Sequence, residues 1–135
     1  MLNWKEEKSD YLFGPHQISD GSLRFMALTT LLLQPPQNLP SVIVLDEPEL
    51  GLHPAAISSL SGMVKAASKH SQVIMATQSP RIVDEFDLSE LLIIERDNKS
   101  NSTVVKSLDK EEFKLWIEEY SNSELWEKNV LGGKP

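Results

Sequence analysis

The sequence of 135 residues contains no cysteine. Disulfide bonds and thiolate metal sites are therefore excluded, and the three histidines lack the spacing of a zinc site. The longest apolar patch, residues 25–33, is too short to cross a bilayer and is interrupted by Thr29 and Thr30. The first residues lack a basic segment followed by an apolar core, so no signal peptide is visible. We expect a cytoplasmic protein without a membrane partner.

Clustered positive charge is also missing. The 13 Lys and Arg residues are scattered among 20 Asp and Glu residues, and the formal net charge is −7. Binding to a phosphate backbone needs clustered basic side chains. We therefore expect any contact with DNA to involve other regions of a larger assembly. The 40% hydrophobic and 24% charged fractions are ordinary for one globular domain of this length.

Hydrophobic patterning predicts helices that alternate with strands. Buried helices are predicted from Ser19 to Leu33, ended by Pro35-Pro36, and from Pro54 to about Ser68. A short helix is predicted at 79–83, and strands at 42–45, 73–76, 91–94 and 103–105. Residues 1–18 are expected to be an irregular lead-in and residues 109–135 a helical tail. The alternation predicts a single α/β domain over residues 1–135, with a layered, parallel-type sheet and flanking helices.

The apolar run 42–45 leads directly into Asp46-Glu47-Pro48. The run fits a strand buried on both faces, as in a parallel sheet flanked by helices. Two acids at the end of such a strand need a reason, because unpaired charges at a core boundary are costly. One interpretation is a metal–nucleotide site, where one acid holds Mg²⁺ and its neighbour polarises the attacking water. The other is a strand end whose acids cap the next turn.

Three further segments carry polar or glycine-rich turns. Ser19-Asp20-Gly21-Ser22 precedes the first long helix, where backbone N–H groups and the helix dipole favour an anion and Gly21 lets a phosphate approach. The alternative is that Ser19 only caps the helix. Residues 48–54 form a tight turn into the second helix. Residues 76–80 are a polar tip after a strand, where open α/β sheets present ligand-contacting side chains.

Taken in order, these segments resemble the motifs of ABC-type ATPases of the RecF/SMC/OLD-like branch, especially bacterial predicted AAA/ABC ATPases. Residues 19–22 look like the signature motif, 42–47 like Walker B, 50–54 like the D-loop and 77–79 like the switch loop. Residues 124–135 also resemble the end of that group, so the likeness covers about residues 12–135. It implies a partial P-loop NTPase fold that uses ATP and Mg²⁺.

The resemblance also implies roles for single residues. Asp46 is expected to order Mg²⁺, Glu47 to activate the attacking water, and Gln78 to sense the γ-phosphate from the same subunit. The γ-phosphate of an ATP held by a second subunit is expected to contact Ser19, Gly21 and Ser22. His53 is expected to lie at the dimer seam. Three residues depart from the broad pattern, namely Asp20, His53 and Gln78, which replace glycine, aspartate and histidine respectively.

No G-x-x-x-x-G-K-[ST] loop occurs in the sequence. That loop supplies the phosphate cradle and its lysine, and Gly132-Gly133-Lys134, which is followed by Pro135, is interpreted as a tail. We therefore expect the chain to be the C-terminal half of an ATPase that is inactive alone and that needs a Walker A half and a homodimeric partner. The alternatives are a non-catalytic module that pairs with a separate ATPase chain, and a metal-dependent nuclease that uses Asp46, Glu47 and Glu49.

Several other polar residues are interpreted as structural. Arg24 is expected to be a partly exposed helix residue near the signature-like turn. Asp84, Glu85 and Asp87 are expected to form a solvated face.

Overall fold

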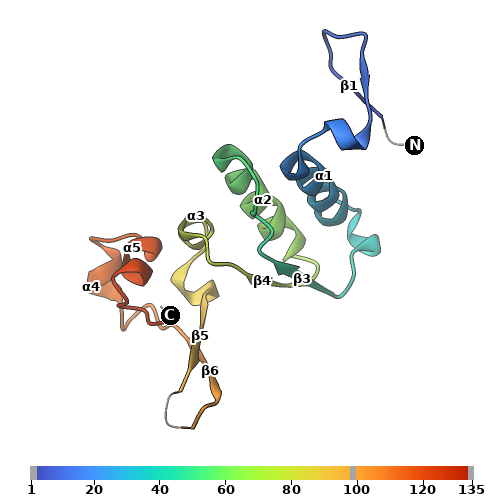
Figure 1. Cartoon of the computed structure of the whole chain (residues 1–135). Coiled ribbons are helices and arrows are strands. Elements are labelled where there is room, and N and C mark those ends of the chain that lie inside the picture. The colour runs from blue at the N-terminus through green and yellow to red at the C-terminus, as the bar shows by residue number, and fades with distance from the viewer. Residues whose placement is uncertain (1–2, 98–99, 134–135) are drawn as a thin grey trace. The chain divides into compact units, whose positions relative to one another are not determined.

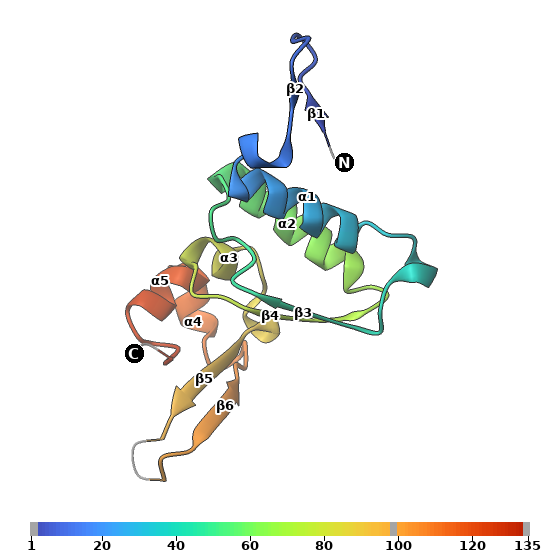
Figure 2. The ribbon, with the colours of Figure 1, turned by 45° about the vertical axis from the view of Figure 1, so that its right-hand side comes forward.

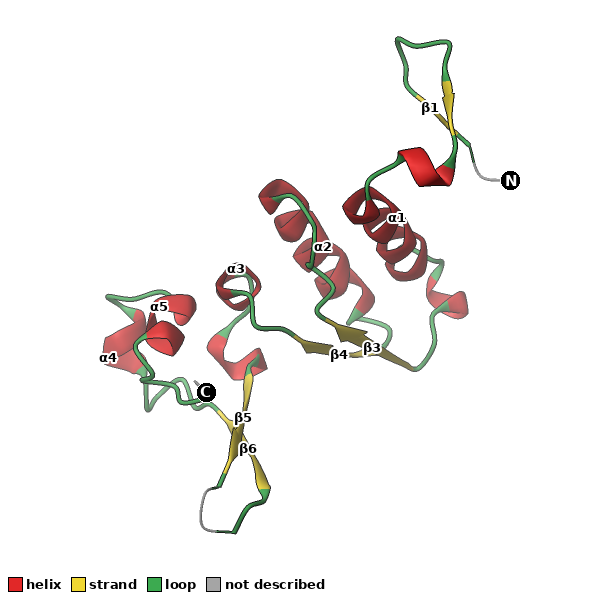
Figure 3. Cartoon of the chain, in the orientation of Figure 1, coloured by secondary structure: helices red, strands yellow, loops and turns green. Residues whose placement is uncertain are grey.

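The computed structural model describes residues 3–97 and 100–133 and divides into two compact units, Met1–Thr77 and Gln78–Pro135. Figures 1 and 3 show their helices and strands. The first unit contains β1 (Trp4–Lys5), β2 (Leu12–Phe13), α1 (Asp20–Leu32), β3 (Val42–Asp46), α2 (Pro54–Ala67) and β4 (Gln72–Ala76), with 3₁₀ turns at Pro15–Gln17 and Pro36–Asn38. The predicted mixed α/β class is confirmed.

The two long helices of the first unit begin at well-defined caps. The Ser19 hydroxyl accepts a hydrogen bond from the backbone N–H of Ser22 at the start of α1, and Pro54 occupies the first turn of α2. The buried residues of α2 recur every three or four positions, which gives the helix one apolar face. In Figures 1 and 2, α1 and α2 lie side by side on the same side of the β3–β4 pair.

Strands β3 and β4 pair in parallel, with Asp46 opposite Ala76 at their carboxyl ends. The expectation that β3 is buried on both faces is wrong, because burial alternates along it. Ile43 and Leu45 are buried, whereas Val42 and Val44 are 47% and 69% exposed. Likewise, α1 buries only Leu28 and Leu32 although it is apolar nearly all round. The physical reason is that, within the first unit, α1 and α2 lie on one side of the β3–β4 pair and leave the outer face of β3 exposed.

The lead-in to α1 contains more structure than its composition predicts. Trp4 and Lys5 pair with Phe13 and Leu12 as two short antiparallel strands. The irregular lead-in expected there is thus partly a hairpin. Its strands are too short for the alternation of apolar and polar residues that identifies a strand in a sequence.

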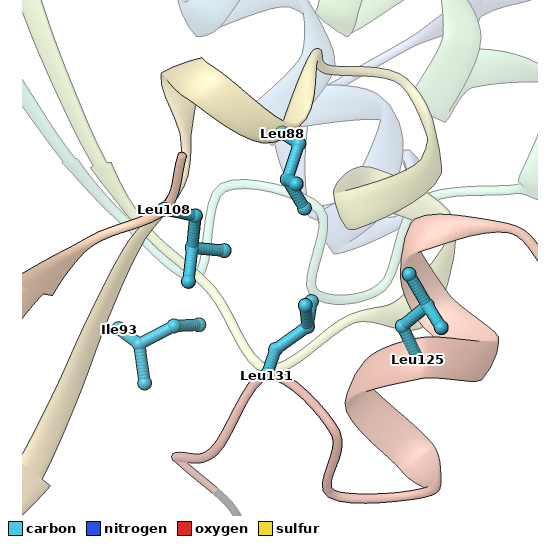
Figure 4. Close-up of a cluster of buried hydrophobic side chains, with 5 residues drawn as sticks. All are labelled: Leu88, Ile93, Leu108, Leu125 and Leu131. Carbon is cyan, nitrogen blue, oxygen red and sulfur yellow. The ribbon is translucent and has the colours of Figure 1, made fainter. Parts of the chain in front are cut away.

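The second unit contains α3 (Pro80–Asp84), β5 (Leu92–Arg96), β6 (Thr103–Ser107), α4 (Lys114–Ile117) and α5 (Asn122–Glu127), with a 3₁₀ turn at Leu88–Glu90. Strands β5 and β6 form an antiparallel pair. Figure 4 shows the core of this unit, where five apolar side chains gather: Leu88, Ile93, Leu108, Leu125 and Leu131. None of the helices in the described ranges is long and apolar enough to cross a membrane.

Asp84 joins α3 to α5 within the second unit. One carboxylate oxygen accepts a hydrogen bond from the backbone N–H of Ser123 at 2.8 Å, and the other accepts from the Ser123 hydroxyl at 2.6 Å. The interpretation of Asp84 as part of a solvated face is therefore incomplete, since this exposed residue is also a packing anchor. Asp87 instead forms a surface ion pair with Lys110.

The glycines near the C-terminus dock onto β5. Gly132 and Gly133 have φ values of +84° and +75°, which glycine adopts without steric cost. The backbone N–H of Gly133 donates a hydrogen bond to Glu95 Oε1 at 2.7 Å. These glycines therefore serve packing, and Lys134 and Pro135 lie outside the described residues.

Candidate functional site

The acid pair lies at the carboxyl edge of the β3–β4 pair. Asp46 ends β3 and is exposed, and Glu47 is half-buried. The Glu47 N–H donates to the carbonyl oxygen of Ala76 at 2.9 Å, which extends the ladder one step beyond Asp46. Because parallel strands present their carboxyl ends at one edge, residues 46–47 and 76–77 meet there, as expected for a ligand-facing edge of an α/β sheet.

Glu47 has an unusual backbone conformation. Its φ is +42°, in the left-handed region that costs a residue other than glycine on the order of 1 kcal/mol. The residue is held there by the N–H bond to Ala76 and by its own carbonyl, which accepts from the N–H of Leu50 at 3.2 Å. Such conformations cluster at functional sites, which makes Glu47 the leading candidate for a chemical role.

The signature-like turn has the geometry of a helix cap. Ser19 Oγ accepts from the Ser22 N–H at 3.2 Å and lies 2.8 Å from Ser22 Oγ. The capping interpretation is confirmed. Both serines are exposed, and they stand at the first turn of a 13-residue helix, where an anion is favoured. Capping and phosphate contact are therefore compatible uses of this turn.

Gly21 brings α1 into direct contact with the turn that follows the acid pair. A Cβ atom at Gly21 would lie 2.2 Å from the carbonyl oxygen of Gly51 and 3.0 Å from its carbonyl carbon. No side chain fits there without displacing backbone. Gly51 itself has a φ of +80°. Sequence reasoning supplied a phosphate-related reason for glycine at position 21, and the structure adds a packing reason.

Arg24 is the residue whose importance sequence reasoning underestimated. Its Nη1 donates to the carbonyl oxygens of Glu47 at 3.3 Å and Leu50 at 2.9 Å. It thereby fastens α1 to the turn that carries the acid pair. The available signal was an arginine two residues after Ser22, within the first turns of the helix. Its partners are backbone atoms, so no complementary residue type marks them in the sequence.

His53 caps α2. Its Nδ1 accepts a hydrogen bond from the backbone N–H of Ala55 at 3.2 Å. Nδ1 is thus the acceptor nitrogen, which leaves Nε2 as the donor when the ring is neutral. His53 is exposed. Its predicted place at a dimer seam stays a prediction, and the cap is a role that the sequence analysis missed.

Glu49 is the third acid of the turn, and it is buried. Its Oε1 accepts a hydrogen bond from the Thr77 hydroxyl, and the side chain is only 8% exposed. Within residues 3–97 and 100–133, no three His, Cys, Asp or Glu side chains converge to hold a metal ion. The three-acid cluster of the nuclease hypothesis is therefore not formed. Gln78 begins the second unit, and its predicted role as a sensor of the γ-phosphate stays a prediction.

Comparisons with known proteins identify the family of the chain and its fold. The sequence family described as "AAA domain, putative AbiEii toxin, Type IV TA system" matches residues 4–84, more than half of the chain. No curated protein matches the chain. A solved structure described as "Structural biochemistry of ATP-driven dimerization and DNA stimulated activation of SMC ATPases" is similar, with a TM-score of 0.59 and 21% identity over 87% of this chain and 70% of that chain. At this identity the likeness shows a shared fold.

Proposed function

Because the chain belongs to this family of AAA domains, we propose that it is the signature and Walker B lobe of an ABC-type ATPase. It hydrolyses ATP when a phosphate loop is supplied from outside these 135 residues and when a second subunit completes the site. The observation that carries the proposal is the contact of α1 with the turn after β3. Gly21 meets Gly51, and Arg24 bonds to the Glu47 carbonyl.

The side chains at the edge of β3 fit Mg²⁺ and a triphosphate. Asp46 offers an exposed carboxylate, and carboxylate oxygens together with water are the ligands that Mg²⁺ prefers. Mg²⁺, when bound, neutralises charge on the transferred phosphoryl group. Asp46 would supply one ligand or hold a ligating water. Ser19 and Ser22 supply hydroxyl donors for phosphate oxygens.

Glu47 has the position of a general base. Its backbone is fixed to Ala76 at the end of the ladder, directly after Asp46 in the sequence. It orients a water molecule and accepts its proton as the water attacks. Gln78, the second residue after β4, senses the γ-phosphate through its uncharged amide. His53 directs Nε2 toward the second subunit.

The outer face of the β3–β4 pair is apolar and exposed, which favours its being covered by a further lobe. Val42, Val44 and Ile74 are 47%, 69% and 49% exposed, and Val44 and Ile74 are directly opposite each other in the ladder. Parallel strands are normally covered on both faces. We assign this face to the lobe that carries the phosphate loop, whether it comes from the same polypeptide or from a separate chain.

The proposed site is divided between two protomers, so it forms only when they dimerise. The similar SMC structure is described by ATP-driven dimerization, and we propose the same use of ATP here. The signature-like turn of one protomer binds the γ-phosphate of an ATP that the other protomer holds. ATP then joins two protomers, and hydrolysis releases them.

The test compares the chain alone with the chain joined to a phosphate-loop lobe. Alone, it is expected to bind ATP weakly or not at all by calorimetry, whereas the joined form hydrolyses ATP. Tight binding by the chain alone would contradict the division of the site. A joined form without turnover that stimulates a separate ATPase would favour the non-catalytic module.

The acid pair is tested by Glu47→Gln in the joined form. The amide keeps the shape but loses the base, so we expect turnover to fall about 100-fold or more and an ATP-bound dimer to accumulate in size-exclusion chromatography. Glu112→Gln removes the same charge from an exposed site in the second unit and serves as the matched control. Undiminished turnover in Glu47→Gln would exclude Glu47 as the base.

A further inference from the structure

Glu49 is the only charged side chain that is buried in the described part of the chain, at 8% exposure. Acidic residues are almost never buried unless they are paired, because removal of a carboxylate from water is costly. Its burial beside the acid pair therefore calls for an explanation.

The two carboxylate oxygens of Glu49 have different surroundings. Oε1 accepts the hydrogen bond from the Thr77 hydroxyl. Oε2 is fully buried and has no hydrogen-bond partner among the described atoms. The side chain thus makes one hydrogen bond and leaves one oxygen unsatisfied, an arrangement that a carboxylate tolerates poorly.

The Glu49–Thr77 bond lies one step beyond the strand ladder. The β3–β4 pairing ends at Asp46 and Ala76, and the Glu47 N–H bond to Ala76 follows. Thr77 comes directly after β4, outside the ladder. The side chain of Glu49 continues the connection between the two strand ends at this point, and Thr77 is the residue directly before Gln78.

Burial decides between a chemical and a positioning role for Glu49. A metal ligand or a general base must meet its ion or water, but Oε2 is enclosed and Oε1 is committed to Thr77. No acidic cluster in the described residues draws Glu49 into a metal site. Glu49 therefore acts through Thr77.

We propose that Glu49 is a positioning residue for ATP hydrolysis: it holds Thr77 against the turn after β3 and so fixes where the switch segment begins. The negative charge is dispensable, because a neutral amide oxygen accepts the same hydrogen bond. This role rests on the proposed function. It predicts that hydrogen-bonding shape at position 49, rather than charge, sets the turnover rate.

The test uses Glu49→Gln and Glu49→Ala in the chain joined to a phosphate-loop lobe. Glu49→Gln is expected to keep kcat within about twofold, whereas Glu49→Ala lowers kcat about 10- to 100-fold and leaves the KM for ATP nearly unchanged, as misplacement of a reacting group does. Thr77→Ser retains the hydroxyl and kcat, and Thr77→Val loses both. The Glu49→Ala/Thr77→Val double variant is expected to be no slower than the slower single variant.

Two outcomes overturn the proposal and are distinguishable. If the wild type turns over ATP but Glu49→Gln is as slow as Glu49→Ala, the charge itself is required and the positioning role fails alone. If the wild type shows no turnover, the proposed function fails and this role with it. The bond is measured separately on the chain alone by urea unfolding. Glu49→Gln should keep or raise the unfolding midpoint, and Glu49→Ala and Thr77→Val should lower it.

Discussion

Replacement of Gly21 by alanine tests the contact between the signature-like turn and the turn after β3. The added Cβ would lie 2.2 Å from the Gly51 carbonyl oxygen, well inside ordinary van der Waals contact. The obstacle is backbone rather than the end of a flexible side chain, so α1 and the turn must move apart by roughly 1 Å. The substitution therefore strains the point where two motifs meet.

The change in the free energy of unfolding caused by Gly21→Ala is the sum of two opposing effects. Overpacking of a tight contact costs about 1–3 kcal/mol, and replacement of glycine by alanine in a helix returns at most about 1 kcal/mol. Gly21 lies at the second position of α1, where the helical gain is smaller than in the interior. The net expectation for Gly21→Ala is a loss of about 1–2 kcal/mol in the free energy of unfolding.

Urea unfolding followed by circular dichroism measures this loss. The helical signal comes mainly from α1 and α2, which have 13 and 14 residues and both belong to the first unit. Gly62→Ala is the matched control, because a Cβ atom added at this position inside α2 would have no neighbouring atom within 4 Å. It should stabilise the unit by about 0.5–1 kcal/mol. If Gly21→Ala is as stable as Gly62→Ala, the close contact with Gly51 does not exist.

Three further substitutions have expected outcomes. Arg24→Lys loses one of two bonds to carbonyl oxygens and should cost about 1 kcal/mol in urea unfolding; an unchanged midpoint would remove Arg24 as a fastening residue. Asp84→Ala leaves two Ser123 donors without their partner and should cost the second unit about 1–2 kcal/mol, read by tryptophan fluorescence. A hydrogen bond from Lys106 and then a backbone N–H hold the pKa of Glu95 below its usual range. Ionised Glu95 therefore stabilises the fold above the usual carboxyl pKa, and this stabilisation is lost as the pH falls through the lowered pKa. In Glu95→Gln, the urea unfolding midpoint should therefore fall less steeply on acidification than in the wild type.

Local signals predicted most of the elements that carry the site. The apolar run before Asp46 predicts β3, and the serine and glycine of residues 19–22 predict the start of α1. Proline at the first position predicts the start of α2. These signals are local because a strand's apolar run or a helix cap involves residues that are close in sequence. The parallel pairing of β3 with β4 follows from the helix that joins them.

Contacts between distant residues could not be predicted in this way. Gly21 meets Gly51 through backbone atoms, and Arg24 bonds to carbonyl groups that every residue has. Neither contact requires a complementary side chain, so neither leaves a pattern in the sequence. The degree of burial was mispredicted for a related reason. An apolar run indicates which residues favour burial, and Val44 shows that burial also needs a second layer.

These backbone contacts separate the residues that build the site from those that face a ligand. Gly21 and Arg24 hold the motifs together, so their substitution should lower both stability and turnover. Asp46, Ser19 and Ser22 are exposed, and surface substitutions usually change stability by no more than about 0.5 kcal/mol. Asp46→Asn should therefore abolish turnover in the joined form while it leaves the unfolding midpoint nearly unchanged. A site whose scaffold is made of backbone contacts keeps its acidic and hydroxyl side chains available for ATP and Mg²⁺, and that division is what the proposed ATPase requires.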